Sequence, residues 1–343
     1  MHTKERRLLI EYNTRSRVSI VSEDSSNNNK SKNVDDHKVE DVRLFKFEYL
    51  KPKYWGVWAF MGFLFISQLF PFKIQWKISR GLAWLTMNLA KSRLHTAKVN
   101  VDICFPELKP EEKTALVKEI FHENMQGYLD SATSWFGNYK RFKSTLEVRG
   151  KEHIDKVQQG GQGVVLAGAH FSILDLAGAL TSLVMEMNVT YRPLDNKLMN
   201  AIMMRGRYRF VTHAYHKKDV KGFINCLKRG EALWYAPDQD YGRKHAVFAP
   251  LFGRQASTIS GLTFLSKSGN ARIVPYSYHR KQDSHEYILE FYEALPDTGN
   301  EEQDAAAYNI WLESAIRRYP AQYLWLHKRF KTQLNPDDKN PYK

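Results

Sequence analysis

The chain has 343 residues, 43 % of them hydrophobic, and a formal net charge of +14. This length accommodates two average domains or one large α/β domain with appendages, and the positive charge points to nucleic acid, an anionic membrane surface or an acidic carrier protein. The two cysteines, Cys104 and Cys226, lack the paired spacing of a zinc site or a disulfide framework, which indicates a reducing compartment.

The amino-terminal segment is polar to about residue 41, low in aromatic residues, and contains a Ser/Asn run at residues 25–29. Such a composition cannot bury enough apolar surface to offset the entropy of ordering. We therefore expect residues 1–50 to form a disordered tail.

An uncharged stretch follows at residues 54–72, with lysines on both sides and aromatic residues near its ends. Its 19 residues just reach the roughly 20 that cross a hydrocarbon core, so residues 51–77 are predicted to be a membrane-anchor helix. Positive charge on both flanks leaves open whether the segment spans the bilayer or lies in its interface. A buried core helix is the alternative, and the position of the segment excludes a cleavable signal peptide.

After a semi-apolar run at residues 78–94, a helix is expected to open at Pro110, with Glu111 and Glu112 in its first turn. From residue 150 onward, short apolar runs alternate with helical patterns, which predicts an α/β fold with a largely parallel sheet flanked by helices. The expected strands are residues 163–169, 189–192, 232–236, 272–278 and, near the edge, 287–293. The expected helices are residues 172–187, 194–208, 219–229 and 304–319.

The first candidate for chemistry is the motif A-H-F-S-I-L-D, in which His170 follows a buried strand and Asp175 lies in the first turn of the next helix. Open α/β sheets place their sites at the carboxyl ends of strands. A carboxylate five residues on can turn back to the imidazole, fix its tautomer and stabilise the imidazolium. A lone histidine is more often a satisfied polar residue, but this context favours a general base.

Two further clusters stand out. Arg205 and Arg207 in M-M-R-G-R-Y-R are suited to phosphate if they lie in an irregular segment that presents both on one side; a solvated basic helix end is the alternative. Asp238 and Asp240 follow a strand in W-Y-A-P-D-Q-D-Y-G, where two acids could bind a metal, orient a base or initiate a turn. No further ligands at regular spacing support the metal.

Together these blocks resemble the late acyltransferases of lipid A biosynthesis, of the lauroyl/palmitoleoyl type, from about residue 51 to residue 330. The matching blocks are K-P-K-Y-W, N-V-D-I-C-F-P-E, H-F-S-I-L-D, Y-R-P-L-D-N, R-G-R, W-Y-A-P-D-Q-D-Y-G-R-K-H-A-V-F-A-P-L-F and Q-Y-L-W-L-H-K-R-F-K. The resemblance implies a glycerolipid acyltransferase-like domain at residues 78–333, followed by a carboxyl-terminal tail at residues 334–343.

The family's H-x-x-x-x-D/E signature falls on His170 and Asp175, which implies a general base and its orienting acid; close relatives more often carry Glu at the second position. The family's functional arginine and its later acid fall on Arg207 and Asp238. We also expect substrate contacts from three neighbours within the matching blocks: Arg192, Arg205 and Asp240.

The resemblance further implies transfer of a fatty acyl chain from acyl carrier protein to a hydroxyl of the Kdo-bearing lipid IVA precursor, with no metal or nucleotide. The expected location is the bacterial inner membrane, with a single amino-terminal anchor and the catalytic domain on the cytoplasmic side. The rivals are a glycerophospholipid acyltransferase, whose Gly-rich arginine block is not found here, and a catalytically silent binder of lipid or carrier protein. A nucleic-acid binder is weaker, since no recognition motif accompanies the basic residues.

Overall fold

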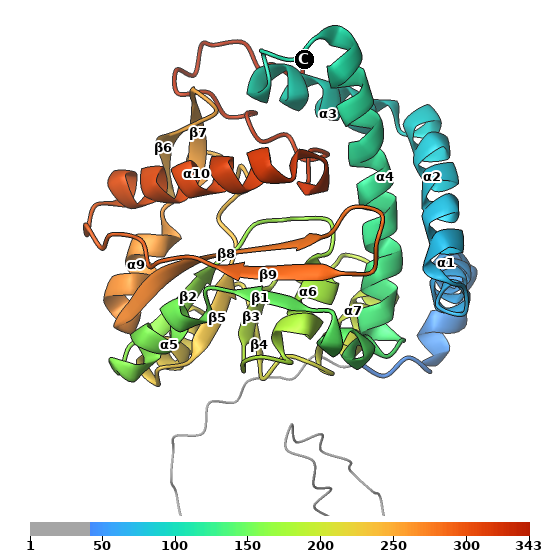
Figure 1. Cartoon of the computed structure of the whole chain (residues 1–343), viewed down its shortest axis with the longest axis horizontal. Helices are drawn as coiled ribbons and strands as arrows, with labels where there is room; N and C mark the ends of the chain where they lie inside the picture. Colours follow the sequence, from blue (N-terminus) through green and yellow to red (C-terminus); the bar gives the residue numbers. More distant parts are fainter. Residues whose placement is uncertain (1–41) are drawn as a thin grey trace, which may run out of the picture. The chain divides into compact units, whose positions relative to one another are not determined.

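A central sheet of seven strands organises residues 42–343, the part of the chain that this computed structural model describes (Figure 1). The strand order is β1-β9-β8-β2-β5-β3-β4, and every neighbouring pair is parallel except β8 and β9. The largely parallel sheet is thus confirmed. The strands are β1 (Glu147–Arg149), β2 (Gly163–Ala167), β3 (Asn188–Tyr191), β4 (Ala214–His216), β5 (Ala232–Tyr235), β8 (Ala271–Arg280) and β9 (Tyr287–Phe291).

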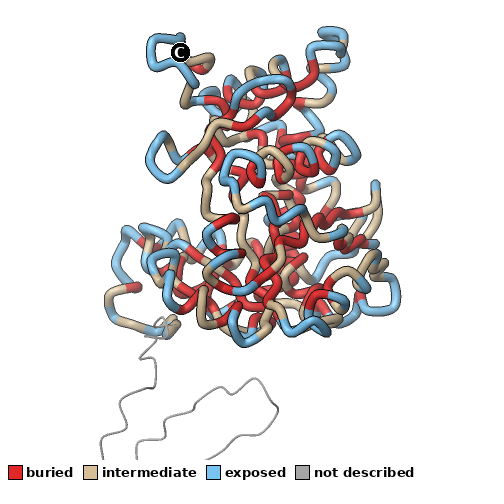
Figure 2. Tube along the Cα trace, turned by 90° about the vertical axis from the view of Figure 1, so that its left-hand side faces the viewer, coloured by how far each residue is buried: buried red, intermediate tan, exposed pale blue. Residues whose placement is uncertain are grey.

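The central strands are buried over nearly their whole length because helices cover both faces of the sheet. All five residues of β2, G-V-V-L-A, are buried, as is nearly all of β8. In Figure 1, helix α10 lies above β8 and β9 and helix α6 lies below them, and Figure 2 shows the buried stretches running through the centre of the molecule. The helices around the sheet are α4 (Pro110–Trp135), α5 (Lys151–Gln159), α6 (Leu174–Thr181), α7 (Lys197–Arg207), α8 (Val220–Lys228), α9 (Gly261–Gly269) and α10 (Glu301–Arg318).

Several elements were not predicted. The strands β1 and β4 have only three residues each, too few to show a period, and α5 and α9 are short. A separate antiparallel hairpin joins β6 (Ala246–Leu251) to β7 (Arg254–Ile259). The two-residue turn of this hairpin, Phe252 and Gly253, has positive φ at both positions, as a type I′ turn requires.

The segment predicted to be one membrane-anchor helix, residues 51–77, does not form a single helix. The stretch is divided between α1 (Trp55–Ser67), which has 13 residues, and the start of α2 (Phe72–Leu89). Pro71 ends the connection and precedes α2, where proline interrupts a helix. At the end of α1, the side-chain amide of Gln68 bonds to α4: it donates to the carbonyl of Leu129 and accepts from the hydroxyl of Thr133. Among the helices of residues 42–343, none combines the length and the apolar character needed to cross a bilayer.

The sequence predicted a tail at each end of the chain, residues 1–50 and residues 334–343. Residues 1–41, most of the predicted tail, lie outside the described residues. At the other end, Tyr342 is buried, and its hydroxyl donates to Asn100 of α3 (Lys91–Cys104) and accepts from the amide of Phe330. The predicted carboxyl-terminal tail, residues 334–343, therefore folds back onto the domain.

A buried ionic cluster fastens α4 to the sheet. Arg280, fully buried near the end of β8, bonds to Glu123 and, through Nε at 3.2 Å, to Asp130, both on α4. The hydroxyl of Tyr287 also donates to Asp130, and the Arg280 guanidinium lies 4.6 Å from the ring centroid of Trp76 on α2. Because the group is out of water, removing one partner leaves the other charges without compensation.

We therefore expect Arg280→Met to lower the free energy of unfolding by about 3 kcal/mol or more, because Glu123 and Asp130 would stay buried and unpaired. The matched control is Arg318→Met: Arg318 also pairs with a glutamate, Glu290, but is 43 % exposed. The control should cost about 1 kcal/mol or less. Urea unfolding followed by circular dichroism measures both, and equal losses would contradict the importance of burial.

Candidate active site

The parallel pairing of β2 with β5 brings together two residues that are far apart in sequence. Ala167, the last residue of β2, is in register with Tyr235, the last of β5. His170 and Asp238 each follow three residues later. Since the carboxyl ends of parallel strands meet at one edge of a sheet, the two loops emerge side by side.

Asp238 holds His170 with both carboxylate oxygens. The Nδ1–H of His170 donates to Oδ1 at 2.7 Å, and the backbone amide of His170 donates to Oδ2 at 2.9 Å. Because the carboxylate only accepts, the proton of the neutral imidazole is on Nδ1 and Nε2 is left as an acceptor. Asp238 is 1 % exposed, whereas the His170 side chain is 24 % exposed, so the histidine can be reached from outside.

The loop that carries His170 is fixed by contacts from distant segments. The amide of Leu324 donates to the carbonyl of His170 at 2.9 Å, and the hydroxyl of Tyr308 donates to the carbonyl of Gly168 at 2.7 Å. A Cβ on Gly168 would lie 2.3 Å from Nε1 of Trp234, so a larger residue there would displace the indole. This position needs glycine for close packing beside the histidine.

The pKa values of the pair follow from burial and from mutual attraction. Burial disfavours the imidazolium of His170, but the charge and the hydrogen bond of Asp238 outweigh it, so the pKa of His170 is raised above its ordinary 6.5. Burial likewise opposes the charge of Asp238, yet His170 and the more distant Arg329 hold its pKa below the ordinary value. Both shifts favour an ion pair when the histidine takes up a proton.

Asp175 contacts an arginine and not the imidazole. The Nε of Arg207 donates to Oδ1 of Asp175 at 2.7 Å, and no hydrogen bond joins Asp175 to His170. The expected contact is absent because Asp238 already occupies Nδ1, while the first turn of α6 faces the last turn of α7. Arg207 is still close enough for its charge to disfavour the protonated form of His170.

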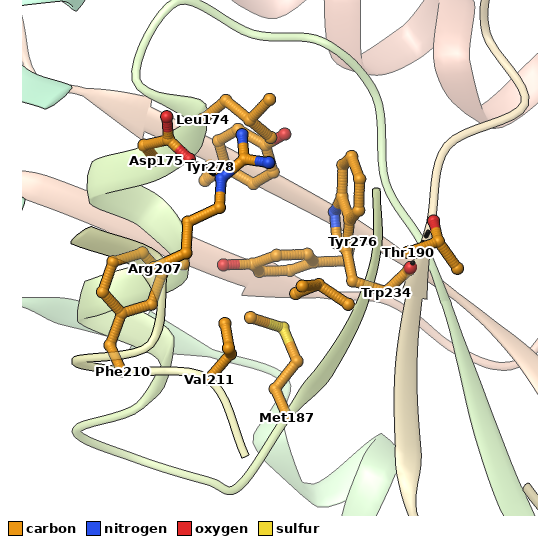
Figure 3. Close-up of a pocket in the computed structure, with 12 residues that line it drawn as sticks. Leu174, Asp175, Met187, Thr190, Arg207, Phe210, Val211, Trp234, Tyr276 and Tyr278 are labelled. Atoms are coloured by element: carbon orange, nitrogen blue, oxygen red, sulfur yellow. Dashed lines mark hydrogen bonds and ion pairs between the residues drawn. The ribbon is translucent and has the colours of Figure 1, made fainter. Parts of the chain in front are cut away.

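A narrow cavity opens beside the Asp175–Arg207 pair (Figure 3). The two charged side chains lie at one end, whereas Met187, Phe210 and Val211 lie away from them. The remaining lining is mostly apolar or aromatic: Leu174, Gly178, Val189, Thr190, Trp234, Tyr276 and Tyr278. A mostly apolar lining with a charged pair at one end has the composition of a hydrocarbon site, and its space of about 40 Å³ holds only part of an acyl chain.

The other predicted site residues lie around this centre. Arg205 and Arg207 lie in the last turn of α7, within the helix expected over residues 194–208, so of the two alternatives the helix end is the one observed. Two helical positions two residues apart face different sides, so the two guanidinium groups are not presented together. Arg205 is exposed, while Arg207 is only 17 % exposed. Arg192 directly follows β3 at the same sheet edge as His170, and it is exposed.

Asp240 is occupied within the protein. Its carboxylate accepts from the amide of Gly242 and from the amide and hydroxyl of Thr332, and its own amide donates to Nε2 of His327. These bonds join the loop of Asp238 to the carboxyl-terminal segment. Asp240 therefore positions the loop of Asp238 and does not face the cavity of Asp175 and Arg207.

Residues near the carboxyl terminus support the site and were not singled out in the sequence. The hydroxyl of Tyr323 donates to the carbonyl of Asp238, and the buried Arg329 donates to Ser257 and Thr258 of β7. No local pattern marks them as site residues; both lie in the block Q-Y-L-W-L-H-K-R-F-K that carries part of the family resemblance.

Comparison with known proteins places the chain in a family. Residues 43–332 match the family described as "Bacterial lipid A biosynthesis acyltransferase", and this match spans most of the chain. The protein is therefore an acyltransferase, and it belongs to the bacterial lipid A biosynthesis acyltransferases.

Three relatives illustrate the likeness. The chain is 36 % identical to the lipid A biosynthesis lauroyltransferase of Escherichia coli K12, over 86 % of this chain and 97 % of the relative. It is 33 % identical to the palmitoleoyltransferase of the same organism, over 84 % and 95 %. A lipid A biosynthesis acyltransferase of Haemophilus influenzae is 32 % identical, over 89 % and 98 %.

We expect Asp238→Asn to lower the pKa of His170, because the substitution removes the negative charge that stabilises the imidazolium. The measurement is the titration of His170 by NMR with labelled histidine, assigned by comparison with a His170→Gln variant. Asp337→Asn, which removes an exposed acid in the carboxyl-terminal segment, is the control and should leave the pKa of His170 unchanged. An unaltered pKa in Asp238→Asn would refute the coupling.

Proposed function

We propose that this protein transfers a fatty acyl chain from acyl carrier protein to a hydroxyl of the Kdo-bearing lipid IVA precursor, with His170 as general base. The observation that carries the proposal is the pair of His170 and the buried Asp238, which leaves Nε2 unpaired next to the cavity wall formed by Trp234. The names of the relatives, lauroyltransferase and palmitoleoyltransferase of lipid A biosynthesis, support the acceptor class.

In the proposed reaction, Nε2 of His170 takes the proton of the acceptor hydroxyl as its oxygen attacks the thioester carbonyl. The carbonyl π electrons move onto oxygen and form a tetrahedral intermediate. When the intermediate collapses, the carbon–sulfur bond breaks, the ester remains on the acceptor, and the thiolate takes the proton from the imidazolium. Asp238 stabilises that imidazolium throughout, by the charge and hydrogen bond that raise the pKa of His170.

Arg207 is the proposed electrophilic group. Its Nε is held by Asp175, which leaves the terminal nitrogens of the guanidinium for the developing oxyanion or for a phosphate of the substrate. Asp175 then acts as a positioning residue for Arg207, and Asp238 takes the role of orienting the base. In this proposal Asp238 stabilises the positive charge of the His170 imidazolium, and Asp175 positions the positive charge of Arg207.

The cavity supplies the proposed acyl site. Its apolar lining by Met187, Phe210 and Val211 would hold the chain while the thioester carbonyl remains near Arg207. The exposed cations Arg192 and Arg205 would contact the anionic groups of donor or acceptor, and the net charge of +14 favours both acidic partners. We place the reaction at the cytoplasmic face of the bacterial inner membrane, where both substrates meet.

His170→Ala should reduce acyl transfer by roughly 10² to 10⁴, the usual effect of removing a general base. The assay follows labelled acyl chain from acyl carrier protein to the Kdo-bearing precursor, and circular dichroism controls for folding. Mass spectrometry of lipid A from cells with and without the gene identifies the chain and its position. A folded His170→Ala protein with the wild-type rate would disprove the mechanism, and an unchanged lipid A with altered glycerophospholipids would disprove the acceptor.

A double-mutant cycle separates the two acids. If Asp175 acts through Arg207, the losses in kcat for Asp175→Asn and Arg207→Ala should be non-additive, with the double variant close to Arg207→Ala alone. The pair Asp238→Asn and Arg207→Ala, which do not bond to each other, should be coupled less strongly, through the pKa of His170 alone. In addition, only Asp238→Asn should move the acid limb of the pH–rate profile to lower pH. Additive losses for Asp175 and Arg207 would contradict the positioning role.

A further inference from the structure

The first three helices form a basic surface with one carboxylate of their own, Asp102 in the last turn of α3, which pairs with Lys113. No Asp or Glu occurs between Glu48 and Asp102, a range that contains α1, α2 and nearly all of α3. The cations of this range are Lys51, Lys53, Lys73, Lys77, Arg80, Lys91, Arg93 and Lys98. Such a one-sided charge is unusual in a chain that is otherwise rich in ion pairs, and it favours an anionic partner.

The same helices expose large apolar side chains. In α1, Met61 and Leu64 are buried, and α1 and α2 both pack against α4 along the same edge of the fold (Figure 1). The sides turned away carry exposed apolar and aromatic residues, which include Trp84 at 68 % and Leu89 at 75 % exposure. Further exposed apolar residues on these two helices and their connection are Trp55, Phe60, Phe65, Ile66, Leu69, Phe70, Ile74 and Leu85. Of these, Phe60 and Phe65 also touch rings at α4, those of Tyr128 and Phe136.

A groove of about 490 Å³ lies on this surface between α2, α3 and α4. Its apolar side is formed by Ala83, Trp84, Met87 and Leu94, and its cations are Arg80, Lys91 and Lys118. The one acid in its lining is Glu119. One carboxylate oxygen of Glu119 lies 3.8 Å from the guanidinium of Arg80, and the other lies 3.2 Å from Nδ1 of the buried His122.

Within residues 42–343, neither Lys91 nor Lys118 forms an ion pair. Two ammonium groups thus remain uncompensated beside exposed apolar side chains. Amphipathic helices that lie in a lipid interface combine these features: cations at the level of the phosphates and aromatic or aliphatic side chains just below them.

We propose that the groove of Arg80, Lys91 and Lys118 binds the phosphate head group of an anionic phospholipid, while the exposed side of α1 and α2 lies in the membrane interface. The inference rests on the membrane location of the proposed function but not on the chemistry of His170. A lipid fits better than an acidic protein because the cations adjoin a long exposed apolar face, which a soluble partner would have to cover as well.

Vesicle binding by the full chain tests the proposal. The wild-type protein should bind vesicles of phosphatidylglycerol and phosphatidylcholine at least about tenfold more tightly than vesicles of phosphatidylcholine alone, since each cation near an anionic surface contributes about fivefold. Lys91→Glu with Lys118→Glu should remove most of this preference. The matched control is Lys339→Glu with Lys343→Glu, two exposed lysines of the carboxyl-terminal segment, which should retain it.

The apolar face is tested separately. Trp84→Glu with Leu89→Glu should weaken binding to both kinds of vesicle, whereas Ile310→Glu should not, although Ile310 on α10 is equally exposed at 70 %. Trp84 and Leu89 lie outside residues 54–72, so an anchor confined to that stretch predicts no effect. Circular dichroism of each variant establishes that it is folded.

Wild-type binding without preference for the anionic lipid would overturn the inference, as would equal losses in the two pairs of lysine variants. Competition by millimolar inorganic phosphate at constant ionic strength would overturn it too, because it would indicate a site for the free ion. Capture of an acidic protein in place of vesicles would also overturn it. Wild-type protein that prefers anionic vesicles but transfers no acyl chain in detergent micelles would contradict the proposed function and leave this inference intact.

Discussion

The pairing of β2 with β5 is the constraint on which the site depends. Ala167 and Tyr235 end their strands in register, so the loops behind them place His170 against Asp238. A shift of either strand by one residue would turn its side chains to the opposite face and separate the pair. The buried strand residues, the close approach of Gly168 to Trp234 and the bonds from Tyr308 and Leu324 all hold this one alignment.

The arrangement divides the work between two acids with different surroundings. Asp238 is buried and gives both oxygens to His170, so it can fix the tautomer and stabilise the imidazolium. Asp175 lies at the cavity and holds Arg207, the group that in the proposed reaction stabilises the developing negative charge. Since Arg207 disfavours protonation of His170 and Asp238 favours it, the two pairs oppose each other in setting the strength of the base.

Long apolar runs made β2, β5, β8 and the parallel sheet predictable, and a histidine directly after such a strand was a clear candidate. The partner of His170 could not be predicted from local spacing, because Asp238 is 68 residues away and meets it only through strand pairing. The five-residue spacing favoured Asp175, but its actual partner is Arg207 on α7, 32 residues away in sequence. The break between α1 and α2 was not predicted, because the apolar run at residues 54–72 continues across it. Pro71 precedes α2, and the side chain of Gln68 at the end of α1 bonds to α4.

The tautomer of His170 is the most direct test of this account. In protein with labelled histidine nitrogens, at a pH above the raised pKa of His170, the account predicts a proton on Nδ1 with a strongly downfield resonance and an unprotonated Nε2. Asp238→Asn should abolish the downfield resonance. A neutral His170 that carries its proton on Nε2 would contradict the account, because that nitrogen could not then accept the proton of a hydroxyl.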